Sequence, residues 1–161
     1  MPVTLEPWGP GDLDVLVRMN TPEMTAFLGG PESTAAVLDR HERYLRPPEL
    51  SPSRMYRIDL DGDPAGAIGY WEGDLEGDPV FETGWSVVPE LQGRGVARTA
   101  LRGLIDLVRD DGRRDRLIAL PGADNVASIA LCRGAGFREH GRLTEVFRGS
   151  ELTFHIWVLD L

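Results

Sequence analysis

The sequence has one cysteine, few histidines and no long apolar run, and each scarcity excludes a class of protein. Cys132 has no partner in the chain, so an intramolecular disulfide is excluded, as is usual in a reducing compartment. His41, His140 and His155 show no metal-ligand spacing, so we expect no metal site. No stretch approaches the ~20 apolar residues of a membrane helix, and the first residues lack a secretory signal pattern. We therefore expect a cytoplasmic protein without membrane contact.

Positive charge is also scarce. Lys and Arg total 17 residues against 26 Asp and Glu, which gives a formal net charge of −9. Duplex nucleic acid is normally bound by concentrated positive charge, so we expect no nucleic-acid partner. An acidic field favours cationic partners, of which a small amine is one. The same acidity also serves solubility alone.

The remaining composition is that of an ordinary globular protein. Its 161 residues, 42% hydrophobic and 27% charged, predict one domain over residues 1–161. The apolar periodicity predicts strands at 3–8, 55–60, 65–71, 80–88, 117–120 and 152–159, with a further strand near Phe137. Helices are predicted from Asp12, from Ser33 or Thr34, over 95–110 and over 125–135. This order predicts an α/β (α+β) domain with a mixed, mostly antiparallel sheet of about six or seven strands and about four helices.

Several local features complete this prediction. We expect Asp12 to cap the first helix and Gly112 to end the long one. The acidic, glycine-rich residues 72–79 are predicted to form a loop. The second helix is expected to share one apolar face among Val37, Leu38, His41 and Leu45.

The segment from Trp85 to Ala97 is the most informative part of the chain. A strand ends there, a glycine-rich turn follows, and an amphipathic helix begins at once. Glycines allow several backbone N–H groups to point at one spot, and the first helical turn adds unpaired N–H groups and a positive dipole end. The segment therefore predicts a phosphate or pyrophosphate site, with Arg94 and Arg98 at its rim. The endings of a P-loop and of a dinucleotide fingerprint are both missing.

Two motifs resemble those of a known family. Gln92-x-x-Gly95-x-Ala97 resembles the acetyl-CoA motif of the GNAT superfamily of N-acetyltransferases. Residues 125–137, which open on Asn125 and close on Gly-Phe, resemble the second signature of that superfamily. The pattern Glu82-x-Gly84-Trp85 is closest to the branch that acetylates the N-termini of ribosomal proteins.

The resemblance implies a cofactor site. The strands that carry Val87 and Leu120 would be parallel and splayed apart, and the pantetheine arm of acetyl-CoA would enter the gap. Acetyl-CoA would be the co-substrate, with no metal, and the amine would attack the thioester directly in a ternary complex. The implied cofactor-binding residues are Val87, Val88, Gln92, Gly93, Arg94, Gly95, Val96, Ala97, Arg98, Asn125 and Ser128. A helix cap alone is the alternative role of Asn125.

Catalysis needs an unprotonated amine and a stabilised thiolate. An alkyl amine has a pKa near ~10.4, so a base must take its proton. Glu82 is the candidate base, and a substrate anchor is its alternative role. Where many family members carry a tyrosine acid, this chain has Cys132, which either donates a proton or packs in the core. Ser128 is a second candidate donor one helical turn away, and solvent is a third.

The acceptor is not identified by the sequence. Tyr70, Trp71 and the acidic residues 72–78 suit a cationic amine pocket, or else form a strand end packed on the core. Residues 27–31 form an acceptor wall or a plain turn. A non-catalytic acyl-CoA-binding module is the alternative to an enzyme, and the oligomeric state, monomer or homodimer, is open.

Overall fold

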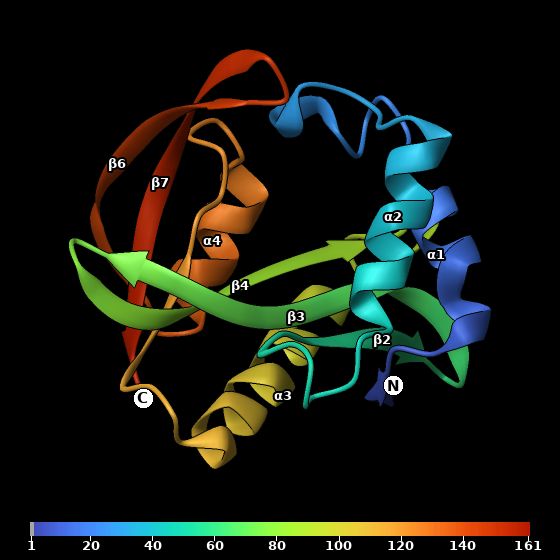
Figure 1. Cartoon of the computed structure of the whole chain (residues 1–161), viewed down its shortest axis with the longest axis horizontal. Helices are drawn as coiled ribbons and strands as arrows, with labels where there is room; N and C mark the ends of the chain where they lie inside the picture. The colour runs from blue at the N-terminus through green and yellow to red at the C-terminus, as the bar shows by residue number, and fades with distance from the viewer. Residues whose placement is uncertain (1) are drawn as a thin grey trace.

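A computed structural model describes residues 2–161 as one seven-stranded sheet with helices on both faces (Figure 1). The strand order is β1-β2-β3-β4-β5-β7-β6, and within the described chain β4 and β5 are the parallel pair. The other neighbouring strands pair antiparallel. The strands are β1 (Val3–Pro7), β2 (Arg54–Leu60), β3 (Asp63–Leu75), β4 (Asp78–Val87), β5 (Arg116–Ala119), β6 (Arg138–Phe147) and β7 (Ser150–Asp160). The predicted fold class is confirmed.

The four α-helices lie between these strands in the chain. They are α1 (Leu13–Met19), α2 (Thr34–Tyr44), α3 (Val96–Asp111) and α4 (Val126–Gly134). Short 3-10 turns η1 (Pro10–Asp12), η2 (Ala26–Leu28) and η3 (Pro89–Leu91) connect the elements. Ser33 caps α2 by accepting a hydrogen bond from the N–H of Ala36 at 3.2 Å, and Gly112 ends α3 in a left-handed conformation with φ 69°.

Strand alternation separates two apolar cores. Ile68 of β3 packs with α3 and α4 in the main core, whereas its neighbour Ala67 packs with α1 and α2 on the opposite face. The main core joins Phe81 of β4 to Leu104 of α3, both fully buried. Full burial of such side chains contributes roughly 1.5–3 kcal/mol each, which fixes α3 against the strand that precedes it.

The acidic residues 72–79 form a hairpin, so the predicted loop is wrong. β3 and β4 run through this segment and turn at Glu76 and Gly77, whose φ values are both positive, at 54° and 91°. Such a pair of positive φ values makes the tight turn that the twist of a hairpin favours. Arg116, which follows α3 in the sequence, pairs with Asp78 at 3.1 Å. The acidic composition of this segment suggested a loop because the partners of its side chains lie elsewhere in the sequence.

Two smaller predictions are also wrong. Asp12 makes no cap hydrogen bond to α1 among the described residues, because its carboxylate is engaged elsewhere. One oxygen accepts from the N–H of Gly9 at 2.8 Å and the other from Arg57 at 2.9 Å. Leu38 is 46% exposed and does not share the buried face of α2.

Candidate active site

The parallel strands β4 and β5 separate along their length. They pair from Phe81–Leu117 to Thr83–Ala119, where β5 ends. β4 continues to Val87, so residues 84–87 have an edge facing away from β3 that the β5 ladder does not use. A strand edge of this kind is a template for another extended chain. The structure thus contains the diverging parallel pair that the resemblance implies.

The backbone at the end of β4 is braced by its neighbours. The N–H of Val88 donates to the carbonyl of Ala65 at 2.8 Å, and the carbonyl of Val88 accepts from the N–H of Leu91 at 3.0 Å. The Gln92 side-chain amide donates to the carbonyl of Val87 at 2.9 Å. Of the two residues predicted to pair with a pantetheine arm, Val88 has both backbone groups engaged. Gln92 ties the turn to the strand end.

The turn between β4 and α3 has the predicted conformation. Gly93 and Gly95 have φ values of 76° and 77°, which side chains other than glycine rarely adopt. A Cβ placed on either glycine would lie more than 4 Å from other atoms, so the space above them is open. α3 begins at Val96, and its first N–H groups point out of a helix 16 residues long. Arg94 and Arg98 are exposed beside it. The turn therefore has the donors, the space and the charge for a phosphate.

The first turn of α4 lies near the start of α3, since Ala127 and Arg98 line one groove. Asn125 caps α4, with its side-chain oxygen accepting from the N–H of Ser128 at 3.2 Å. The cap is thus present in the structure, and ligand binding by the Asn125 amide stays a prediction. Ser128 is half-buried.

Cys132 is fully buried in the main core. Burial raises the pKa of its thiol to about 12. An ordinary thiol has a pKa near ~8.5, so proton transfer from Cys132 to a thiolate leaving group would run uphill. The environment of Cys132 favours the packing role over the acid role.

A groove of about 370 Å³ lies between α3 and α4. It begins at Arg98, the last residue of the predicted phosphate turn. The remaining lining residues are mostly small and apolar: Leu101, Arg102, Ala127, Ala130, Leu131, Gly134 and Ala135. An apolar floor with two guanidinium groups on its α3 side suits a flat ring that carries phosphates.

Glu82 lies where β4 and β5 are still paired, opposite Ile118 of β5 and Trp71 of β3. Burial raises the pKa of its carboxyl from 4.5 to about 6, a hydrogen bond with Trp71 lowers it in part, and the nearby Glu145 carboxylate raises it again. A carboxylate with a pKa near 6 is mostly ionised at neutral pH and more basic than an exposed one. Glu145 belongs to β6, and the sequence analysis did not single it out.

The glycine of the Glu82-x-Gly84-Trp85 pattern has a packing reason. A Cβ on Gly84 would lie 3.0 Å from the indole of Trp71. Gly84 therefore lets Trp71 lie across β4 beside Glu82. Trp71 thus lies next to the candidate base, and its place in an amine pocket stays a prediction.

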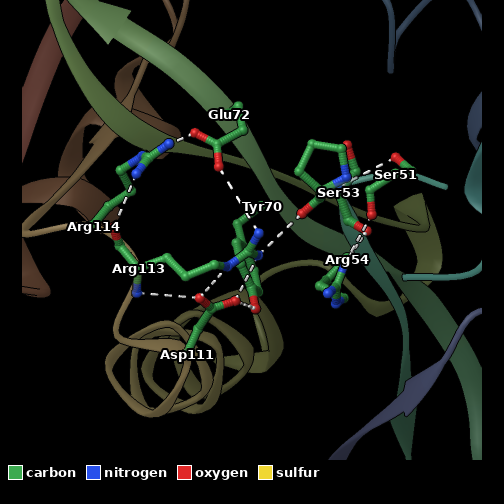
Figure 2. Close-up of polar contacts among 9 residues, drawn as sticks. Ser51, Ser53, Arg54, Tyr70, Glu72, Asp111, Arg113 and Arg114 are labelled. Carbon is green, nitrogen blue, oxygen red and sulfur yellow. Dashed lines mark hydrogen bonds and ion pairs between the residues drawn. The ribbon is translucent and has the colours of Figure 1, made fainter. Parts of the chain in front are cut away.

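The other half of the predicted amine pocket is wrong. Tyr70 is buried, and its hydroxyl donates to Asp111 of α3 at 2.7 Å (Figure 2). The carboxylate of Glu72 accepts from Arg114 at 3.0 Å in the same network (Figure 2). These groups tie the end of α3 to β3 and are occupied by the protein's own arginines, so they do not offer a pocket for a cation.

A second, smaller cavity of about 40 Å³ opens beside Ser86, on the face of β4 that carries Glu82. Three ionic side chains line it, Glu32, Arg40 and Arg148, and the sequence analysis named none of them. Its other lining residues are Leu16, Met19, Asn20, Met24, Thr25, Leu28 and Val37. Residues 27–31 thus supply part of a cavity wall through Leu28.

The described residues 2–161 hold no cluster of three or more His, Cys, Asp or Glu side chains arranged to bind a metal ion. Within the same residues, none of the helices combines the length and apolar character needed to cross a bilayer.

The diverging strands, the glycine turn at a helix start and the half-buried glutamate agree with the acyltransferase class that the sequence motifs resemble. A family model described as an acetyltransferase (GNAT) domain matches residues 3–138. The chain therefore belongs to the GNAT family of acetyltransferases. A comparison with curated proteins gives no match.

Solved structures support this assignment across the whole chain. The ribosomal-protein-alanine N-acetyltransferase from Brucella melitensis is 25% identical with a TM-score of 0.78, and all of both chains is covered. RimL, a ribosomal L7/L12 alpha-N-protein acetyltransferase solved with coenzyme A, is 18% identical with a TM-score of 0.82, over 99% of this chain and 94% of that one. The aminoglycoside acetyltransferase AAC(6')-Ib, also solved with coenzyme A, is 20% identical with a TM-score of 0.76, over 99% and 95%. The ribosomal-protein branch suggested by the sequence is thus among the structural neighbours.

Proposed function

We propose that the protein transfers the acetyl group of acetyl-CoA to a primary amine, by direct attack in a ternary complex. The observation that carries this proposal is the joint placement of three features. The β4 edge at residues 84–87, the glycine turn at the start of α3, and Glu82 lie along one strand and the turn that follows it. Family membership and neighbours solved with coenzyme A support the same reaction.

The co-substrate would be held by the predicted residues other than Val88, whose backbone groups are already engaged. The N–H groups from Gly93 to Arg98 suit the pyrophosphate, because the space above Gly95 is open and the dipole of α3 is positive there. The β5-facing edge of β4, up to Val87, would pair with pantetheine. The α3–α4 groove, with Arg98 at its end, would take the remaining phosphate-bearing part.

Glu82 would take the proton from the attacking amine, directly or through a water. The amine nitrogen forms a bond to the thioester carbon, the carbon–sulfur bond breaks, and the sulfur leaves as a thiolate. An amine loses its proton readily only to a base of suitable strength in reach. A pKa near 6 keeps Glu82 ionised at neutral pH and still able to accept a proton.

The thiolate would be stabilised by Ser128 rather than by Cys132. Ser128 is half-buried at the first turn of α4, where its hydroxyl can donate a hydrogen bond. Cys132 lies in the core with a raised pKa. Protonation by solvent after departure completes the cycle.

Mass spectrometry of an amine panel incubated with acetyl-CoA tests the proposal. The chain has no lysine, since all basic residues other than histidine are arginines. The enzyme therefore has no side-chain amine whose own acetylation would be mistaken for turnover of an acceptor. We expect enzyme-dependent acetylation of at least one amine, with coenzyme A released in equal amount. Tight binding of acetyl-CoA without turnover of any amine would instead support a non-catalytic binding module.

A further inference from the structure

The cavity beside Ser86 is walled by one carboxylate and two guanidinium groups. Glu32 forms ion pairs with Arg40 of α2 and with Arg148 of the β6–β7 turn, the latter at 3.3 Å. Arg148 also donates to the carbonyl of Gly30 at 3.2 Å. These contacts join the β6–β7 turn to α2 and to the segment just before it, which are far from that turn in the sequence, and Figure 1 shows the β6–β7 turn reaching toward the segment before α2.

The charges on this wall do not cancel. Two guanidinium groups face one carboxylate, which leaves a charge of about +1 at the cavity. Only 26% of the side-chain surface of Arg40 and of Arg148 is exposed, and 13% of that of Glu32. Burial also lowers the pKa of Arg148, which marks its charge as poorly solvated. Arg148 uses two of its five N–H groups in the contacts with Gly30 and Glu32, so donors remain for another acceptor.

The distance from the cavity to the candidate base Glu82 follows from the geometry of β4. Ser86 and Glu82 share one face of β4 and are four residues apart, or roughly 13 Å at the rise of a strand. On the facing hairpin, Glu145 lies on β6 and Arg148 lies in the turn that follows it, with a left-handed φ of 51°. Glu145 acts on the Glu82 carboxyl, and Arg148 lines the Ser86 cavity. β4 and the facing hairpin therefore each contribute one residue at the candidate base and one at the Ser86 cavity, and the spacing along β4 puts the two places on the order of 10 Å apart.

We propose that the acceptor amine also carries an anionic group about 10 Å away, bound by Arg148 and Arg40 while the amine lies at Glu82 and Glu145. This inference rests on the proposed acetyl transfer and names its substrate class. Arg148 and Arg40 are then specificity-determining residues. The anion is the carboxylate of a short peptide or of an unbranched amino acid of similar length.

Matched acceptors test this preference. Tri-alanine places its terminal carboxylate about 10 Å from its amine when extended, and its C-terminal amide has the same length without the charge. The pair 8-aminooctanoate and 8-aminooctanamide repeats the comparison without a peptide backbone. We expect kcat/KM to be about tenfold or more higher for the carboxylate of a preferred pair, since charged hydrogen bonds are the stronger ones. Preference in both pairs means that the charge suffices, and preference for tri-alanine alone means that a peptide is also recognised.

Variants assign the preference to the cavity. Arg148→Gln and Arg40→Gln should each lower kcat/KM for the carboxylate acceptor about tenfold and leave the amide acceptor and the KM for acetyl-CoA nearly unchanged. Arg148→Lys should restore part of the preference. Arg142→Gln is the matched control, because Arg142 is exposed on the same hairpin and does not line the cavity.

The possible failures are distinguishable. Equal kcat/KM for both members of each pair in the wild type would overturn the inference and leave the transferase function standing. Turnover of neither member, or of any amine, would overturn the proposed function and the inference with it. If Arg148→Gln slowed both acceptors equally, Arg148 would only hold the hairpin in place, and its specificity role would be excluded.

Discussion

Replacing Glu82 by glutamine should change both the stability and the rate of the protein, with pH dependences that can be worked out beforehand. Burial raises the pKa of the Glu82 carboxyl from 4.5 to about 6. A raised pKa in the folded state contributes stability that is present below the unfolded pKa and is lost as pH rises through about 6. The shift is about 1.5 units, so ionised Glu82 costs on the order of 2 kcal/mol at neutral pH. Glu82→Gln should therefore be more stable than the wild type at pH 7.5 by up to ~2 kcal/mol, and nearly equal to it at pH 4.5.

The catalytic rate of Glu82→Gln should fall, although its stability at neutral pH rises. The wild-type kcat/KM should rise with pH through an apparent pKa near 6, and Glu82→Gln should lack this limb and lose roughly 10²-fold at pH 7. Urea denaturation at the two pH values and a pH–rate profile measure the two effects. Glu6→Gln, an exposed glutamate on β1, is the control that should alter neither. A variant that kept the wild-type acid limb would remove Glu82 from proton transfer, and a loss of stability at pH 7.5 would refute the desolvated carboxylate.

The remaining predictions address the cofactor turn, the leaving group and the α3 network. Gly95→Asp should greatly weaken coenzyme A binding in calorimetry and lower stability by about 1–2 kcal/mol. Gly77→Asp is the control: Gly77 also has a positive φ and open space, so this variant should lose as much stability but keep the affinity for coenzyme A. Equal affinities in the two variants would refute the phosphate site at the turn. Ser128→Ala should slow single turnover more than Cys132→Ala, which should instead lower stability by about 1 kcal/mol, and the reverse order of rates would reassign the donor. Asp111→Asn should lower stability at pH 7 by about 1 kcal/mol, because the neighbouring Arg113 and the Tyr70 hydroxyl hold the pKa of Asp111 at about 2. That difference should shrink toward pH 3, since stability from a lowered pKa is lost as pH falls, and a constant difference in thermal melts would argue against the charge.

Local signals made the cofactor side of the site predictable. The turn needs positive φ values at positions 93 and 95, which glycine adopts readily, and an amphipathic helix follows. The turn and the start of α3 could therefore be predicted from adjacent residues. Asn125 and Gly136 likewise mark the two ends of α4, with a side-chain cap and a φ of 93°. Each of these features depends on backbone conformation within a few residues.

Features that depend on distant partners could be predicted only in part or not at all. Strand alternation placed Glu82 on one face of β4, but its raised pKa also depends on burial and on Glu145, which comes from another strand. Residues 72–79 have the composition of a loop but form strands, in which Leu75 is buried with Ile118 of β5 and Val158 of β7 and the carboxylates of Glu72 and Asp78 pair with distant arginines. The cavity at Ser86 takes its lining from α1, α2, the segment between them, β4 and the β6–β7 turn, so no local pattern marks it.

The overall charge is therefore a poor guide to the acceptor. A net charge of −9 favours cationic partners at long range, but salt screens exposed charges beyond about 8 Å at physiological ionic strength. Within that distance the charged groups of the site itself determine which acceptor binds. The carboxylates of Glu72 and Asp78 are already paired with arginines. At the Ser86 cavity, by contrast, the two positive charges of Arg40 and Arg148 share the single negative charge of Glu32. An acceptor that brings its amine to Glu82 and an anion to this arginine pair is thus matched to the site, although the protein as a whole is acidic.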